Sequence, residues 1–260
     1  MKHLSKISIA SLALIAGTSV LAQSKPAEPD FTLAYNIGAV SDYRFRGITQ
    51  TANQASIQGG IDFAHKNGVY LGAWAASNLK WIKEFNGASK GDYEVDLYGG
   101  YKFNAMGLGF DLGAITYQYP GNTSGEGTTT LSKADTYELY GAVTYSVVTL
   151  KYSQSMGDFL GIKDSNGSRY WDLSANLDLG SGFTLTPHIG SQTIPANIGN
   201  TSNNANYTDY AITLNKDFGK GLSASIAAVG TDAKEGGFYS QSDGRFLAKG
   251  GVFLGVKYTF

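Results

Sequence analysis

The stretch DYEVDLYGGYKF, residues 92–103, decides the fold of this 260-residue chain. Its odd-numbered positions are mostly apolar or aromatic, and its even-numbered positions are mostly charged. Successive side chains of a strand point to opposite faces, so this alternation predicts a strand with one apolar and one charged face. The apolar face holds Tyr93, Val95, Leu97, Tyr101 and Phe103. The charged face holds Asp92, Glu94, Asp96, Tyr98 and Lys102.

The same period-two alternation recurs along nearly all of the chain after residue 30. No segment shows a 3.6-residue apolar stripe of helical length, so we expect an all-β fold. Twelve strands are predicted, at residues 31–46, 54–64, 69–78, 92–103, 108–119, 135–145, 148–155, 168–177, 183–192, 206–215, 221–230 and 247–260.

The connections between these strands alternate in length. Short turns at 65–68, 104–107, 146–147, 178–182 and 216–220 alternate with long connections at 47–53, 79–91, 120–134, 156–167, 193–205 and 231–246. In an up-and-down meander every second connection lies at the same end. Short turns at one end and long polar loops at the other predict a closed antiparallel up-and-down transmembrane β-barrel of the outer-membrane type. An even strand number places both termini at the turn end.

The composition narrows the possible functions. With Lys+Arg 20 and Asp+Glu 21 the formal net charge is −1, so we expect no nucleic-acid partner. The 34 glycines, 17 tyrosines and 13 phenylalanines are typical of a β-rich protein with many turns. The sequence has no cysteine, which excludes disulfides, thiolate metal sites and a cysteine nucleophile. No cofactor is expected.

Residues 1–22 have the pattern of an export signal. Lys2 and Lys6 precede an apolar run at 7–17, and Val20 and Ala22 stand at the −3 and −1 positions of a cleavage site. A membrane anchor is the alternative, but the apolar run is short for a span. We therefore expect a cleaved signal peptide at 1–22, a short linker at 23–30 and a barrel at 31–260 in the bacterial outer membrane.

The apolar faces could point inward, as in a soluble lipocalin-like barrel, or outward to lipid. The number and length of the strands and the aromatic residues at strand ends favour lipid outside. The chain ends in FLGVKYTF, in which Gly255, Tyr258 and the terminal Phe260 resemble the assembly signal of bacterial outer-membrane proteins. The partners expected are therefore outer-membrane lipid, the barrel assembly machinery, and small solutes or ions.

If lipid lies outside, the polar faces line the lumen. By strand parity, the candidates for lumen lining are charged or titratable residues on these faces. They are Asp42, Arg44, Arg46, Asp62, Asp92, Glu94, Asp96, Lys102, Asp111, Glu138, Lys151, Asp172, His188, Asp209 and Lys257. As an open pore they would create weak ion selectivity, and as a plug they would pair and close the lumen. Parity leaves both alternatives open.

The segment SDYRFRG, residues 41–47, is predicted to continue the first strand. On that strand Tyr43 and Phe45 would face lipid or the interface, while Asp42, Arg44 and Arg46 would face the lumen. We expect the two arginines to meet the acidic run Asp92, Glu94 and Asp96, or Asp62, on nearby strands.

Catalysis has one candidate, because the chain has only three histidines and His188 alone lies on a polar strand face. Paired with a serine, it could serve an outer-membrane lipase. A lone histidine in a lumen is more often a filler that takes part in an ion pair, so we expect no enzyme. The carboxylates Asp92, Glu94 and Asp96 alternate too widely for one small metal ion.

Three segments carry a family resemblance: VSDYRFRGITQT at 40–51, ASIQGGIDFAHKNGVYLGAWAASN at 55–78 and EVDLYGGY at 94–101. They resemble the TorF porin family, also described as the Gcw family of conserved hypothetical proteins. The first motif matches at Val40, Ser41, Asp42, Tyr43, Arg46, Gly47, Thr49 and Gln50. The second matches at Gly68, Tyr70, Gly72, Trp74, Ser77 and Asn78, with an extra alanine before the serine. The resemblance is strongest over the first 120 residues and implies a pore without naming a solute.

Three functions remain open. The first is a porin-like channel for passive diffusion of small hydrophilic solutes or ions through a charged lumen. The second is a non-conducting structural or surface-binding barrel that uses its long loops. The third is an outer-membrane lipid-modifying enzyme dependent on His188.

Overall fold

A computed structural model describes residues 29–127, 131–198, 201–202, 205–241 and 243–260. Twelve strands form its wall, as the sequence predicted, and strand β10 continues after one residue as β11. The wall strands are β1 (Phe31–Val40), β4 (Ser56–His65), β5 (Val69–Ser77), β6 (Tyr93–Ala105), β7 (Leu108–Gln118), β8 (Thr136–Tyr145), β9 (Val148–Ser155), β10 (Arg169–Ala175) with β11 (Leu177–Gly180), β12 (Phe183–Thr193), β15 (Tyr207–Gly219), β16 (Leu222–Thr231) and β17 (Gly251–Thr259).

Each wall strand pairs antiparallel with its neighbours in the chain, and β17 closes the barrel by pairing with β1. This closing seam has five residue pairs, from Asn36–Thr259 to Val40–Gly255, and the neighbouring β1–β4 ladder has ten. A backbone hydrogen bond of 2.8 Å from the terminal Phe260 N–H to the Tyr35 carbonyl extends the seam. Closure removes the unpaired edges that an open sheet would expose to lipid.

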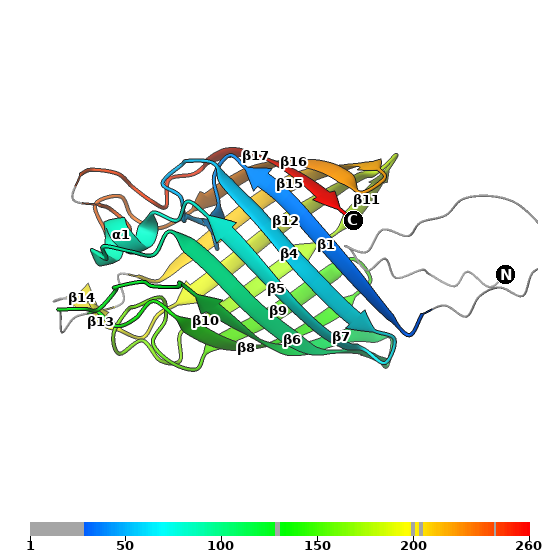
Figure 1. Ribbon diagram of the computed structural model, residues 1–260, viewed down its shortest axis with the longest axis horizontal. Coiled ribbons are helices and arrows are strands. Elements are labelled where there is room, and N and C mark those ends of the chain that lie inside the picture. Colours follow the sequence, from blue (N-terminus) through cyan, green and yellow to red (C-terminus); the bar gives the residue numbers. More distant parts are fainter. Residues whose placement is uncertain (1–28, 128–130, 199–200, 203–204, 242) are drawn as a thin grey trace, which may run out of the picture.

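The short turns and the long loops lie at opposite ends of the barrel (Figure 1). The six loops are loop 1 (41–55), loop 2 (78–92), loop 3 (119–135), loop 4 (156–168), loop 5 (194–206) and loop 6 (232–250). Strand β1 begins and strand β17 ends at the turn end, as an even strand number requires. Within the described residues, no helix is both long and apolar enough to cross a membrane.

The outer face of the wall is an apolar belt. Large apolar side chains stand exposed at alternate positions, among them Leu112 at 54% and Leu254 at 58% relative exposure. Their chain neighbours Asp111 and Phe253 point to the opposite face. In water such a belt would be costly, whereas in a bilayer it faces hydrocarbon. The outward apolar face therefore matches a transmembrane barrel.

The compact apolar core of this protein lies in the loops. Three buried clusters hold residues from all six loops, including Leu79 and Ile82 of loop 2 and Ile194 of loop 5, each at most 1% exposed. The expectation that the long loops are polar was wrong for their inner sides, which are apolar. The loops carry four short strands and one helix: β2 (Arg44–Phe45), β3 (Ile48–Thr49), α1 (Trp81–Asn86), β13 (Asn197–Ile198) and β14 (Thr201–Ser202).

Candidate functional site: the barrel interior and its loop cap

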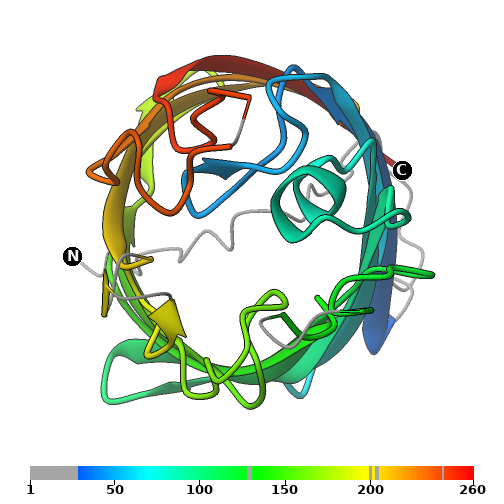
Figure 2. The ribbon, with the colours of Figure 1, turned by 90° about the vertical axis from the view of Figure 1, so that its left-hand side faces the viewer.

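Loop 1 leaves the wall and folds into the barrel. Strand β1 ends at Val40, six residues earlier than predicted. Arg46 and Gly47 have φ values of 48° and 80°, a left-handed conformation that turns the chain into the β2–β3 hairpin. Viewed from the loop end, this hairpin and helix α1 lie inside the ring of strands (Figure 2). A Cβ on Gly47 would lie 2.8 Å from Asp209 Cβ, so the close approach to strand β15 also requires glycine.

This path corrects the predicted environment of the two aromatic residues in SDYRFRG. Tyr43 and Phe45 face neither lipid nor the interface. The Tyr43 ring packs edge-on against Trp74 on strand β5, with 5.3 Å between centroids. The Phe45 ring packs in the same way against Tyr117 on strand β7, at 5.2 Å. Both rings therefore anchor loop 1 to the inner wall.

Arg46 ties loop 1 to strands β8 and β12. Its guanidinium donates 2.6 Å to Glu138 Oε2 on strand β8 and 2.7 Å to Gln192 Oε1 on strand β12. It also lies 4.3 Å from the centroid of the Tyr170 ring. Burial alone would lower the pKa of Arg46, but the charge of Glu138 outweighs it and leaves that pKa above its usual value. Arg46 therefore stays charged inside a buried pair.

Arg44 stabilises the hairpin itself. Its Nε donates 2.8 Å to Asp42 Oδ2, and its guanidinium carbon lies 4.2 Å from the Phe253 ring of strand β17. Asp42 also accepts hydrogen bonds from the hydroxyls of Thr49 and Thr51. The prediction that the arginines meet Asp62 or the run 92–96 was wrong, because each finds another carboxylate once loop 1 folds inward.

Glu94 and Asp96 instead form a buried pair beneath Tyr43. The Tyr43 hydroxyl donates 3.0 Å to Glu94 Oε1, and burial raises the pKa of that hydroxyl well above its usual value. Glu94 is 1% exposed and Asp96 6%. Glu94 Oε2 and Asp96 Oδ1 find no hydrogen-bond partner within the described residues. The pair therefore lies in the interior without a cation from the arginines that were expected there.

A second network surrounds His188 on strand β12. Its Nδ1 lies 2.9 Å from Asp172 Oδ2 and its Nε2 lies 2.7 Å from Asp209 Oδ1. The Tyr170 hydroxyl donates 2.9 Å to Asp209 Oδ2. Carboxylates thus hold both ring nitrogens, which leaves neither positioned to accept a proton from a serine. Lys151, on strand β9, stands across the register from Asp172 and over the Tyr140 ring at 4.0 Å.

Tyrosines connect the remaining inward charges. Tyr70 donates 2.6 Å to Asp111 and also meets Tyr140, while Lys102 lies 3.9 Å from Asp111. Separately, Tyr98 donates 2.5 Å to Asp62, which also accepts a hydrogen bond from Asn36. Inward-facing tyrosines therefore fill this part of the lumen and satisfy its carboxylates.

Two predicted lining residues lie elsewhere than in these networks. Asp92 belongs to loop 2 rather than to a strand, where it pairs at 2.6 Å with Lys83 of helix α1. Its prediction as a strand residue was wrong, because strand β6 starts one residue later. Lys257 lies on strand β17 beside Gly38 and Ser223, with no charged partner among the described residues.

Of the three assembly-signal positions, Gly255 faces Ser225 inside the barrel, whereas Tyr258 and Phe260 pack edge-to-face at 5.0 Å outside it.

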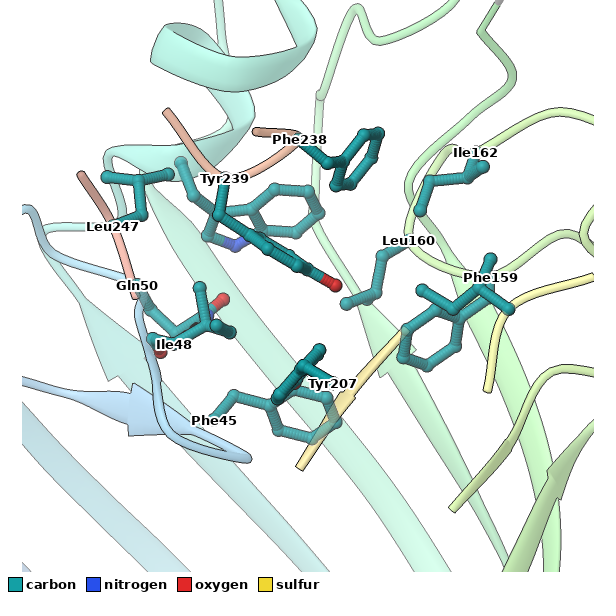
Figure 3. A pocket seen from close by; sticks show the side chains of 12 residues that line it. Phe45, Ile48, Gln50, Phe159, Leu160, Ile162, Tyr207, Phe238, Tyr239 and Leu247 are labelled. Carbon is teal, nitrogen blue, oxygen red and sulfur yellow. Dashed lines mark hydrogen bonds between the residues drawn. The ribbon is translucent and has the colours of Figure 1, made fainter. Parts of the chain in front are cut away.

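The loops close over the interior as a cap. Backbone hydrogen bonds of 3.0 Å from Thr49 to Leu247 and of 2.8 Å from Lys80 to Gln50 tie loop 1 to loops 6 and 2. The Tyr239 hydroxyl of loop 6 donates 2.6 Å to the Ala205 carbonyl of loop 5. Figure 3 shows the apolar pocket at the centre of the cap, where Phe45, Phe159 and other side chains of loops 1, 4 and 6 converge. Its volume is about 50 Å³.

A larger cavity of about 310 Å³ lies along the wall made by strands β15, β16, β17, β1 and β4. Small side chains and glycines leave this space free, and Trp74 of strand β5 also lines it. Its polar lining is Asn36, Gln58, Thr213, Asn215, Ser223, Ser225 and Lys257. Across the described part of the chain, no cluster of three or more His, Asp or Glu side chains could hold a metal ion.

Residues 23–260 match the family model described as "Bacterial protein of unknown function (Gcw_chp)". The chain belongs to the Gcw_chp family. A comparison with curated proteins found no match.

Among solved structures, the barrel of this Gcw_chp member is similar to the KdgM porin, with a TM-score of 0.53, 8% identity, and coverage of 87% of this chain and 99% of that one. It is also similar to the NanC porin, with a TM-score of 0.52, 11% identity, and coverage of 88% and 99%. A second KdgM structure, described as a complex with disordered oligogalacturonate, has a TM-score of 0.51, 8% identity and coverage of 88% and 98%. At such low identity these likenesses show the fold.

Several residues of the interior were not among the predicted ones. Tyr70, Tyr140 and Tyr170 hold the buried carboxylates, and Gln192 shares Arg46 with Glu138. Strand parity could have found the tyrosines. Tyr140 and Tyr170 each stand two residues from an inward-facing charge, and Tyr70 occupies an inward-facing position of strand β5. The prediction considered only charged side chains and therefore missed the hydroxyls that partner them.

Proposed function

We propose that this protein is an outer-membrane porin-like channel that passes small hydrophilic solutes or ions by passive diffusion. The observation that carries the proposal is the polar cavity of about 310 Å³ inside a barrel whose outer face is apolar. A wall lined with amides and hydroxyls offers water and solutes a path that the apolar belt outside does not. The resemblance to the TorF porins and the porin fold support the same function. Residues 1–22 are then a cleaved signal peptide, and they lie outside the described residues.

Planar-bilayer recording of the refolded protein tests this proposal. We expect discrete conductance steps that fall when the cavity is narrowed by Ser225→Trp, since Ser225 lines it. The matched control is Ile226→Trp, which places the same bulk on the outer face, where Ile226 is 45% exposed. Conductance that responds to neither variant, or equally to both, would contradict a path along this wall.

The cap favours a second candidate, a barrel that does not conduct. All six loops contribute residues to the packed apolar clusters, and side chains of loop 1 bond to strands β6, β8 and β12 of the inner wall. Recording a variant in which residues 43–53 are replaced by a short glycine-serine linker distinguishes the two. If the intact protein is silent and the variant conducts, loop 1 closes a channel; if both are silent, the barrel is structural.

The geometry gives the third candidate, a lipid-modifying enzyme, little support. Both nitrogens of His188 are held by Asp172 and Asp209 rather than by a serine. Lipid profiles unchanged by His188→Ala are the expected result.

A further inference from the structure

Most polar side chains that line the cavity along strands β15–β17, β1 and β4 are not hydrogen-bonded to the described part of the protein, which distinguishes this cavity from the rest of the interior. The side chains of Gln58, Thr213, Asn215, Ser223 and Ser225 line it, and within the described residues none of them makes a hydrogen bond to the protein. Elsewhere in the lumen, tyrosine hydroxyls donate to carboxylates, as Tyr70 does to Asp111 and Tyr170 to Asp209. Donors and acceptors that remain unused at a cavity wall are available to water or to a solute.

Lys257 gives this cavity its charge. Among the described residues that line the space, it is the charged one, and it forms no ion pair with the described chain. Its cross-strand neighbours are Gly38 on β1 and Ser223 on β16, so neither adjacent strand places a counter-charge beside it. The ammonium group therefore presents its full charge to whatever enters.

Trp74 adds an aromatic surface to the same space. It lies on strand β5, and the Tyr43 ring of loop 1 packs edge-on against it. A flat apolar face beside amides, hydroxyls and one cation suits a solute with a compact carbon skeleton, several hydroxyls and a negative charge. The volume of about 310 Å³ lies at the lower end of the range of small-molecule pockets, roughly 300–1,000 Å³.

We infer that this cavity is a binding site for small hydroxylated anions, such as sugar acids, and that Lys257 is the residue that selects for their charge. The inference rests on the proposed channel function, because it names the solute class that the channel would favour. The carboxylates nearest the cavity already have partners: Asp62 on strand β4 accepts hydrogen bonds from Tyr98 and Asn36, and Asp209 on strand β15 is held by His188 and Tyr170. Asp111 and Asp172 lie farther round the wall, on strands β7 and β10, beside Lys102 and His188.

Gluconate is a suitable probe, because it carries one carboxylate and several hydroxyls, and glucose is its neutral counterpart. We expect gluconate to bind the detergent-solubilised protein in calorimetry and to block chloride current in bilayers, with glucose much weaker in both. Lys257→Gln should weaken gluconate binding by about tenfold, the lower range for a charge-assisted hydrogen bond, and Lys257→Arg should retain it.

The matched control is Lys216→Gln. Lys216 is also near the turn end, but it stands over the Phe183 ring at 4.4 Å on the outer face of strand β15. Removing its charge should leave gluconate affinity unchanged.

Equal loss in Lys216→Gln, no loss in Lys257→Gln, or glucose binding as tightly as gluconate would overturn the inference. Failure of the channel proposal has a different signature. A protein that binds gluconate through Lys257 but never conducts supports the site and refutes the channel, whereas a conducting protein that ignores gluconate refutes the site alone.

Discussion

The two halves of the barrel interior are built in opposite ways. From strand β6 to strand β12 the wall carries carboxylates, tyrosines and His188 in hydrogen-bonded networks, which extend to Tyr70 on strand β5 and Asp209 on strand β15. From strand β15 through β17 to β4 it carries glycines, serines and amides that leave a cavity of about 310 Å³. The same twelve-strand frame thus supports a filled half that anchors the loops and an open half with space for solute. The difference teaches that counting inward-facing charged residues does not give the charge that a solute meets, because most of these residues pair with one another or with tyrosines in the filled half.

The largest expected effect comes from the ion pair that ties loop 1 to the filled half. Arg46→Ala leaves Glu138 buried without its cation, and breaking a buried pair in this way costs about 3–5 kcal/mol. We expect that loss in urea unfolding, together with faster proteolysis within loop 1. Lys257→Ala, in the open half, should change the free energy of unfolding by at most about 0.5 kcal/mol. Similar losses for both would erase the contrast between the halves.

A charge placed on either side of one open-half strand provides a sharper test of its space. Ile212 faces outward at 57% exposure, and its neighbour Thr213 lines the cavity. Ile212→Arg should destabilise the barrel by about 2–4 kcal/mol, the cost of a basic side chain at mid-bilayer. Thr213→Arg should cost far less, because the cavity admits the side chain and its water. The comparison requires unfolding in lipid vesicles, and a reversed order would mean that this wall does not enclose free space.

The smallest expected changes in the free energy of unfolding distinguish hydroxyls that are hydrogen-bonded within the protein from hydroxyls that are not. Tyr170→Phe removes the hydroxyl that donates to Asp209 and should cost about 1–3 kcal/mol in urea unfolding. Ser223→Ala removes a hydroxyl that bonds to no described residue and should fall within about 0.5 kcal/mol of the parent protein. If Ser223→Ala were the more damaging change, the hydroxyls of the open half would have a structural partner.

The wall was predictable because its information is local. Alternation along a strand needs only a few residues, and the alternation of short and long connections assigned each strand end to a side. The prediction failed first at residue 41, where the alternation of Tyr43 and Phe45 continues but the chain turns inward. The left-handed conformation of Arg46 and Gly47 ends the strand, and Gly47 was the one sequence signal of that turn.

The partners of the interior charges were beyond sequence reasoning for a different reason. Arg46 meets Glu138 and Gln192, residues that lie far along the chain on two separate strands. That meeting depends on how loop 1 crosses the lumen, which no periodicity encodes. Parity could place the side chains of Glu138 and Asp209 on the inner face of their strands, but it could not match them to a cation or a tyrosine.

The closing seam between β1 and β17 has a consequence for biogenesis. Nearly the whole chain separates Asn36 from Thr259, so this pairing has the greatest loop-closure entropy of any in the barrel, and its ladder has only five residue pairs. Until the final strand docks, β1 presents an unpaired edge that could recruit a foreign strand. The Phe260 N–H extends this pairing by its hydrogen bond to the Tyr35 carbonyl, and loss of residues 255–260 would remove that bond and all five residue pairs of the seam.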